Sequence, residues 1–336
     1  PSPPPPSPPP SPSPPPPPKL FFDSRLKECA VALGATATRV AVAEPCWELA
    51  DGTMEDIPED FLADTTKLTG TLKLGAAVKT IGVRAFARTK LTGLDLSDAT
   101  SLVTIGDTAF LETDITGTLV IPAKVETIGE FAFRLTKLTG LDLSQAVSLV
   151  TIGKRAFGET NLEGTLVIPA KVKTIGEFAF YKTMLTSLDL SQAASLVTIG
   201  KRAFGEIYNL KGMLVIPAKV KTIGEFAFYK TMLTSLDLSQ AASLVTIGKR
   251  AFGEIYNLKG MLVIPAKVET IGEFAFYKTI LTSLDLSQAA SLVTIGKRAF
   301  GDTKLTGKIE TPFKVPTYTK SGSTASFPSG VTIVKG

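Results

Sequence analysis

The residues with the clearest potential for chemistry are aspartates that recur at one place in a repeating sequence. They alternate with valines, which spaces them about 10 Å apart if each repeat advances by one strand spacing. Paired carboxylates in glycosidases need a cleft and two different environments, whereas these sites are identical. We interpret them as a solvated face, or as a weak cation- or sugar-binding stripe. The candidate binding residues are Asp142, Asp189, Asp237 and Asp285, with Asp95 in the same column.

Other reactive side chains are scarce. The chain has no histidine, which removes most catalytic triads and acid-base arrangements. Cys29 and Cys46 are the only cysteines, so a metal site is not expected. In a secreted protein two such cysteines predict a disulfide, with two free thiols as the alternative. We therefore predict no enzymatic activity, no cofactor and no metal.

Charged and aromatic residues alternate after each Ile-Gly. The first position holds Glu130, Lys154, Glu177, Lys201, Glu225, Lys249, Glu273 and Lys297. The second position holds Phe131, Arg155, Phe178, Arg202, Phe226, Arg250, Phe274 and Arg298. If successive repeats stack, these columns predict ion pairs and Arg-aromatic contacts, each contributing about 0.2 to 1 kcal/mol.

The elements that would position these columns are coils of a repeat array. Residues Leu185 to Met232 recur from Leu233 to Ile280 with two differences, and the phrase Thr-Ile-Gly-x-x-Ala-Phe occurs ten times at intervals of 23 or 24 residues. Such a period is typical of solenoids, in which each coil buries its apolar face against its neighbours. Two coil types alternate, so the charge columns explain why the repeating unit is two coils, since identical neighbours would bring like charges together.

Each coil predicts two short strands and a turn. An alternating run such as Leu214 to Ile216 is typical of a strand with its leucines facing inward. The following Val-x-x-Ile-Gly favours a second extended segment, and the Ala-Phe after it favours one turn of helix or 3₁₀ helix with Phe in the core. The predicted fold is a strand-rich repeat solenoid with parallel β-sheets.

The repeat resembles a known family. Leu214, Ile216, Pro217, Val220, Ile223, Gly224, Ala227 and Phe228 carry a pattern similar to the BspA-type leucine-rich repeat. The resemblance covers roughly residues 57 to 312, although the cysteine that often follows Ala-Phe in the family is absent. It implies a leucine-rich-repeat horseshoe or flattened solenoid, extracellular or cell-surface placement, and adhesion or recognition instead of catalysis.

Residues 1 to 18 consist of fourteen prolines and four serines. This composition predicts a polyproline II tail. Its Ser-Pro blocks resemble those of extensins and related hydroxyproline-rich glycoproteins, which implies proline hydroxylation and O-glycosylation; the alternatives are a bare spacer or a docking site for a proline-binding domain. The candidate modified residues are Pro3, Pro4, Pro5, Pro6, Pro8, Pro9, Pro10, Pro14, Pro15, Pro16, Pro17, Ser2, Ser7, Ser11 and Ser13.

The remaining boundaries follow from where the repeat starts and stops. We predict an N-terminal cap over 19–63, with a short helix within 21–33, and a solenoid of about ten coils over 64–312. Residues 313–336 would form a C-terminal cap or an assembly segment whose exposed edge pairs with another molecule. The chain begins at Pro1 without a signal peptide, which suggests a processed amino terminus or a fragment.

Composition limits the partners. The net charge of +5 is spread through the repeats, which argues against nucleic acid. No apolar run approaches the ~20 residues of a membrane span. Two hypotheses remain: a structural glycoprotein of a wall, coat or filament that associates with itself, or a surface adhesin that binds a protein or glycan. Near-identity of the coils favours the first, because a site for one defined ligand usually differs from coil to coil.

Overall fold

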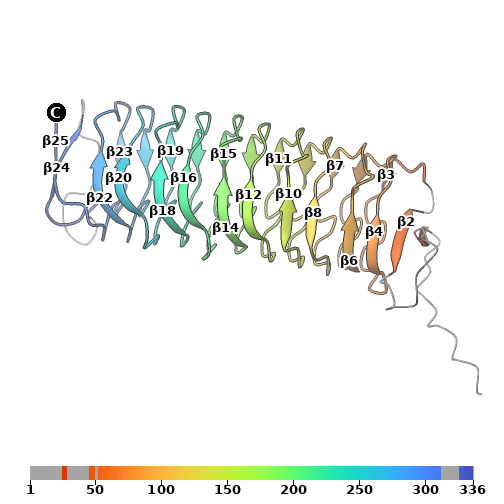
Figure 1. Ribbon diagram of the computed structural model, residues 1–336. Coiled ribbons are helices and arrows are strands. Elements are labelled where there is room, and N and C mark those ends of the chain that lie inside the picture. Colours follow the sequence, from red (N-terminus) through yellow and green to blue (C-terminus); the bar gives the residue numbers. More distant parts are fainter. Residues whose placement is uncertain (1–24, 29–44, 50–51, 312–324, 336) are drawn as a thin grey trace, which may run out of the picture.

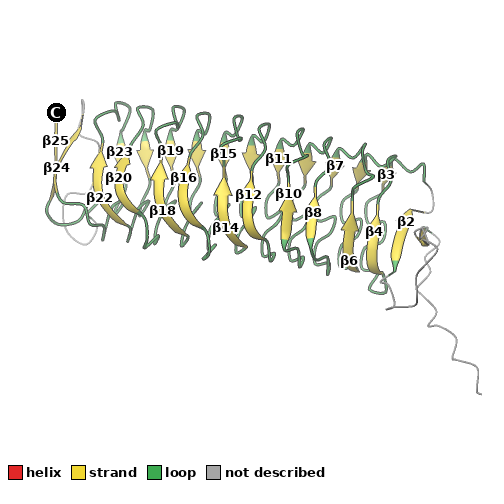
Figure 2. Cartoon of the chain, viewed as in Figure 1, coloured by secondary structure: helices red, strands yellow, loops and turns green. Residues whose placement is uncertain are grey.

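The computed structural model describes residues 25–28, 45–49, 52–311 and 325–335. These residues form one elongated stack of coils that runs from β2 at one end to β25 at the other (Figure 1). All regular elements in them are strands, and turns connect the strands (Figure 2). The predicted strand-rich parallel solenoid is therefore confirmed, whereas the Pro/Ser tail lies outside the described residues.

One side of the stack is a parallel sheet of eleven strands, which we call the Thr-Ile sheet. Each strand is two residues long, and from β5 onward Thr pairs with Thr and Ile with Ile from coil to coil, for example Thr198 with Thr222 and Ile199 with Ile223. In the first strand, Asp56 takes the place of Thr and pairs with Thr80. The isoleucines are buried and the threonines half-buried. The strands are Asp56–Ile57 (β3), Thr80–Ile81 (β5), Thr104–Ile105 (β7), Thr127–Ile128 (β9), Thr151–Ile152 (β11), Thr174–Ile175 (β13), Thr198–Ile199 (β15), Thr222–Ile223 (β17), Thr246–Ile247 (β19), Thr270–Ile271 (β21) and Thr294–Ile295 (β23).

The other side carries longer strands, which we call the long-strand face. Its strands are Thr69–Lys73 (β4), Lys90–Asp95 (β6), Thr118–Val120 (β8), Gly140–Asp142 (β10), Glu163–Val167 (β12), Met184–Asp189 (β14), Lys211–Val215 (β16), Met232–Asp237 (β18), Lys259–Val263 (β20) and Ile280–Asp285 (β22). Strands that end in Asp (β6, β10, β14, β18, β22) are called aspartate strands, and those that end in Val (β8, β12, β16, β20) valine strands. They hydrogen-bond in parallel pairs, such as β12 with β14 and β16 with β18, and the ladder is interrupted between pairs.

The turn that contains Ala-Phe is not helical, so the prediction of a helical or 3₁₀ turn was wrong. Arg202 and Glu206 adopt left-handed φ angles of 51° and 56°. The N–H groups of Arg202, Phe204 and Glu206 donate to carbonyl groups of the next coil, at 2.7–2.8 Å. In a helix each N–H beyond the first turn bonds to a carbonyl of the same helix, whereas here alternate N–H groups bond to the neighbouring coil.

The core is a column of stacked phenylalanines. Ring centroids of successive residues lie 5.2–5.5 Å apart with interplanar angles of 4–8°. The column consists of Phe86, Phe110, Phe133, Phe157, Phe180, Phe204, Phe228, Phe252, Phe276, Phe300 and Phe327. The predicted core position of Phe is confirmed, and every coil is tied to its neighbours by the same contact.

The N-terminal end departs from the predicted cap. Cys46–Leu49 (β2) pairs in parallel with β4, and β3 belongs to the Thr-Ile sheet, so the solenoid begins inside the segment predicted as a cap. Leu26–Glu28 (β1) pairs with β2 in the antiparallel direction. The helix predicted within 21–33 is therefore wrong for these residues, because their backbone hydrogen bonds go to a strand that is distant in sequence.

The C-terminal end extends the stack. Gly307–Thr311 (β24) pairs in parallel with Val331–Lys335 (β25). Phe327 stacks on Phe300, and the N–H of Phe300 donates to the Ser326 carbonyl at 2.8 Å. The last described segment thus imitates one more coil.

Candidate binding face

The aspartates of the candidate binding face end their strands. In each, one carboxylate oxygen accepts the backbone N–H of the serine two residues later, at 2.8 Å from Ser144 to Asp142 and 2.7 Å from Ser239 to Asp237. The same bond forms at Asp95, Asp189 and Asp285. This local bond turns the chain away from the strand. The primary role of the column is therefore structural, which sequence reasoning missed although the Asp-x-Ser spacing signals it.

The same bonds affect ionisation. Hydrogen bonds from the backbone and side chain of Ser144 hold the pKa of Asp142 below its usual range. At Asp95 burial acts to raise the pKa, but hydrogen bonds from Ser97 and the charge of Lys73 outweigh it, so the pKa is lowered. Both carboxylates are thus ionised at neutral pH, which suits contacts with cations or hydroxyl groups and does not suit a general acid.

Open grooves lie where the long-strand face is interrupted. They occur between β6 and β8, between β10 and β12, and between β14 and β16, with volumes from ≈ 490 to ≈ 730 Å³. Each joins an aspartate strand to the following valine strand, which belongs to another hydrogen-bonded pair. The grooves therefore repeat once per two coils.

The lining of each groove is nearly the same. The β10–β12 groove contains Asp142, Val167, Pro169, Lys171 and Gln192. Equivalent residues line the other two, which places Asp189 in the β14–β16 groove. An apolar floor with one carboxylate, one ammonium and one amide can bind an extended polar chain, but the geometry brings no two carboxylates together for catalysis.

Exposed apolar side chains add to this face. Met213 on β16 and Met261 on β20 are 62% and 61% exposed, and Val120 and Val167 also point to solvent. Val120, Val167 and Met213 line the grooves, so the face is partly apolar, unlike the solvated face expected from its aspartates.

The flank formed by the turns carries the predicted charge pairs. Lys201 Nζ lies 3.3 Å from Glu225, and Lys154 and Lys249 pair with the glutamates of their following coils in the same way. Within the described residues no ion pair links Glu177 to Lys201, so the expected continuous ladder is a series of separate pairs. Pairing between neighbouring coils is nevertheless confirmed.

Arginines stack between aromatic rings, as predicted. The guanidinium carbon of Arg202 lies 5.6 Å from the Phe178 ring centroid and 4.6 Å from that of Phe226. Arg155 and Arg250 are placed alike. Because Arg202 also lies 3.8 Å from Glu206, its side chain fixes this flank and is not free to recognise a ligand.

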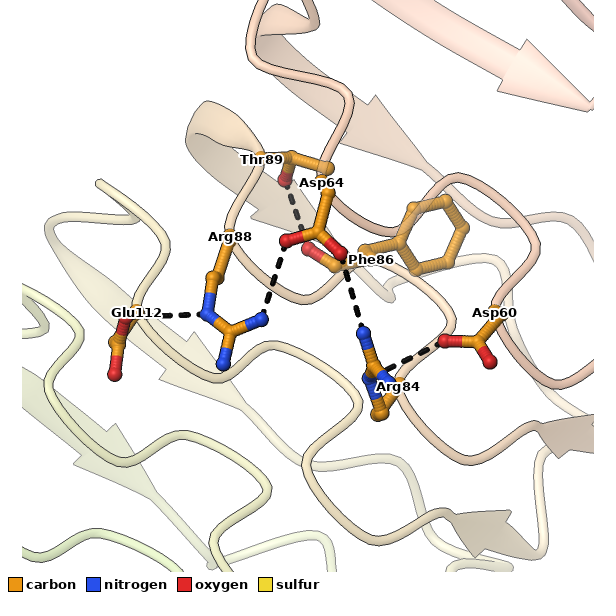
Figure 3. Close-up of polar contacts among 7 residues, drawn as sticks. All are labelled: Asp60, Asp64, Arg84, Phe86, Arg88, Thr89 and Glu112. Atoms are coloured by element: carbon orange, nitrogen blue, oxygen red, sulfur yellow. Dashed lines mark hydrogen bonds and ion pairs between the residues drawn. The ribbon is translucent and has the colours of Figure 1, made fainter.

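In the first coils, charged side chains also pair with one another (Figure 3). Asp64 accepts hydrogen bonds from Arg84 and Arg88, and Arg88 also pairs with Glu112 of the next coil. Thr89, drawn above them, is buried and its hydroxyl donates to the Phe86 carbonyl at 2.9 Å.

This buried threonine recurs three residues after most core phenylalanines, which sequence reasoning overlooked. The others with the same bond are Thr113, Thr136, Thr160, Thr183, Thr231, Thr279 and Thr303. Its fixed spacing was the available signal.

Within the described residues, neither a free thiol nor a metal-binding cluster is found. Cys46, on β2, is disulfide-bonded; its predicted partner Cys29 lies outside the described residues, so the pairing stays a prediction. In the described part of the chain, no cluster of His, Cys, Asp or Glu is placed to hold a metal ion. The described residues also include no helix that could cross a membrane.

Coils of 23 or 24 residues, two parallel strands per coil and an inward leucine pattern define a leucine-rich-repeat solenoid. The sequence pattern of the BspA type leucine rich repeat region (6 copies) matches residues 55–186, 144–259 and 173–307. The chain belongs to this family.

Solved structures resemble it in part, and no curated protein matches it. A leucine-rich repeat protein from Bacteroides ovatus is 22% identical, with 86% of this chain and 82% of that one covered and a TM-score of 0.45. The pneumococcal vaccine antigen PcpA is 16% identical, with 88% and 90% covered and a TM-score of 0.40. The functional domain of InlJ from Listeria monocytogenes is 16% identical, with 75% and 62% covered and a TM-score of 0.23.

Proposed function

We propose that the chain is a non-enzymatic extracellular structural glycoprotein. The solenoid serves as a rigid rod, and the Pro/Ser tail over 1–18 carries O-linked glycans and connects the rod to a wall, coat or filament. The observation that carries the proposal is the uniformity of the rod. One phenylalanine column and one Thr-Ile sheet continue through nearly identical coils, which suits length and stiffness more than recognition of a single ligand.

The chemistry of the described residues supports a role without catalysis. The repeated carboxylates accept backbone hydrogen bonds, the arginines stack between aromatic rings, and the charge pairs lie between coils. The carboxylates thus fix turns within a coil, and the arginines and charge pairs connect one coil to the next.

The proposed role of the tail is tested by analysing its covalent modifications. Amino-acid analysis and mass spectrometry of native protein should find hydroxyproline and O-linked sugar within residues 1–18, and fractionation should recover the protein with wall or surface material. Protein made in bacteria, which lacks such modification, is the mass control. An unmodified tail in native protein would contradict the glycoprotein proposal.

A second function, recognition of a protein or glycan on the long-strand face, is favoured by the grooves. Three similar grooves in a row can bind a repeating polymer through several weak sites at once. Glycan and surface-protein arrays test it. Val167→Glu should abolish a specific signal, whereas Val83→Glu, on the turn flank where other coils have Glu, should not. Equal binding by both variants would contradict recognition through this face.

A further inference from the structure

The long-strand face carries more apolar surface than its own folding requires. Four of the five methionines of the chain are exposed on it, at Met184, Met213, Met232 and Met261. They gather on β14 to β20, and Ile280 continues them onto β22. Clusters of exposed apolar residues mark association surfaces more often than scattered ones do, and methionine adapts readily to a facing surface.

Comparison of equivalent positions in different coils shows that the fold does not require methionine there. Where β14 and β18 begin with Met184 and Met232, the corresponding residues of earlier coils are Lys90 and Lys137. Where β16 and β20 have Met213 and Met261, earlier valine strands have Thr118 and Thr165. Lysine and threonine thus satisfy the fold at these positions. The methionines serve something other than the coil.

The charges on the same strands are ordered in rows. Lys211 lies in register with Met232, and Val215 in register with Asp237. Lysines therefore begin the valine strands β16 and β20, and aspartates end the aspartate strands. Within the described residues, Lys211 and Lys259 form no salt bridge, and each aspartate bonds to serine through only one oxygen. Lysines without a salt bridge thus follow one border of the face, and along the other border each aspartate keeps one oxygen that does not bond to serine, beside a groove lysine such as Lys219.

We propose that this face packs against the same face of a second copy, about a two-fold axis parallel to the rod. Such a rotation keeps the order of the coils and reverses the strands, so that strand starts lie over strand ends. Lys211 then faces Val215 of the second copy, with Asp189 and Asp237 one strand to either side and within reach of its long side chain. Met213 faces Met213 of the second copy near the axis. Each contact between different residues, such as Lys211 with Asp189, occurs twice, as a two-fold interface requires.

A second copy is the partner that fits because it has the same period. Lysines and aspartates recur every two coils, about 10 Å along the rod, and a partner with another spacing loses register after a few strands. Two sheets stack about 10 Å apart with their strands nearly aligned, which leaves room for interleaved methionines. The inference deepens the proposed assembly role, on which it rests, by naming the partner and the face.

Sedimentation equilibrium of the unmodified full-length chain tests the interface without the glycans of the tail. The wild type should form dimers at micromolar concentration. A variant with Met184→Lys, Met232→Lys, Met213→Thr and Met261→Thr introduces residues native to other coils, so it should keep its fold, as circular dichroism and thermal unfolding will show. Its dimer should be at least about tenfold weaker. Val83→Lys, which places a lysine where Lys154 and Lys201 stand on the turn flank, should dimerise like the wild type.

The position of the two-fold axis is tested with the substitution M213C. Mild oxidation should link two copies through this position, while V83C should stay unlinked. A wild type that remains monomeric up to high micromolar concentration, or a dimer unaffected by the four substitutions, would overturn the inference. Neither result touches the glycosylated wall role, which rests on the modification and location of the native protein.

Discussion

At the scale of single residues, the stacked phenylalanines are among the largest fully buried side chains. Phe204 is fully buried, and its ring lies 5.4 Å from the rings of both Phe180 and Phe228. Each ring therefore covers two neighbours, and its loss would leave a cavity between two coils. The buried threonines support this column, because their hydroxyl groups donate to phenylalanine carbonyls that also accept the threonine N–H.

The first prediction concerns this column. Phe204→Ala should lower the free energy of unfolding by about 3–5 kcal/mol, since it creates a cavity in a packed core. Tyr256→Ala, at an exposed tyrosine two coils away, should change it by less than about 0.5 kcal/mol. Chemical denaturation of both variants measures the difference. Similar losses of stability in the two variants would show that the phenylalanine stack does not stabilise the core.

The second prediction concerns the Asx turns. The pKa of Asp95 and Asp142 is lowered in the folded chain, so their contribution is present above the pKa of unfolded aspartate, about 3.9, and is lost as pH falls through the folded value. Asp95→Asn with Asp142→Asn keeps an oxygen that accepts the serine N–H but cannot titrate.

This double variant should lose less stability than the wild type between neutral and acid pH. Thermal unfolding across the range measures the slope. Equal slopes for the two proteins would contradict the role of these carboxylates.

At the scale of the elements, the glycine after Thr-Ile sets how closely coils approach. A Cβ on Gly200 would lie 2.6 Å from the carbonyl carbon of Gly176, whereas a Cβ on Gly75 would meet no atom within 4 Å. Gly200→Ala should therefore cost about 1–3 kcal/mol through forced backbone movement. Gly75→Ala should be close to neutral. Denaturation curves of the pair test this, and a neutral Gly200→Ala would show that the coils can separate locally.

The capping element adds a fourth prediction. Cys46 is disulfide-bonded, and peptide mapping without reduction should link it to Cys29. Closing a loop of this size stabilises a fold by about 3 kcal/mol, so reduction should lower the unfolding temperature. A Cys46 found in a peptide without Cys29 would instead indicate a bond between molecules.

Several features of the coils could be predicted from the sequence. Strand periodicity, the core phenylalanines and the coil-to-coil pairs of Lys201 with Glu225 were predictable, because each depends on spacing within one coil or between identical neighbours. The left-handed turn at Arg202 and Glu206 was not, since neither residue type favours a positive φ.

Two other features depend on distant partners. The strand β1 forms because β2 offers an antiparallel edge, and nothing within Leu26–Glu28 distinguishes it from a helix. The grooves depend on where hydrogen bonding between the long strands stops, which no residue within a single coil signals. The candidate aspartates could therefore be placed on a face, but not in grooves.

At the scale of the whole molecule, the coils make a rod with two distinct long sides and two distinct ends. The turn flank carries coil-to-coil ion pairs and arginine-aromatic stacks, and the long-strand face has grooves and exposed methionines. At the N-terminal end β1 runs antiparallel to the solenoid strands, so simple continuation of the stack into another molecule is interrupted there. Lateral association fits this distribution better than end-to-end growth.

The most direct test of the structural role is electron microscopy of the native material. The account predicts rods held side by side or through their tails in an ordered wall, coat or filament. Discrete monomers with free tails, in material taken from the cell surface without disruption, would contradict it.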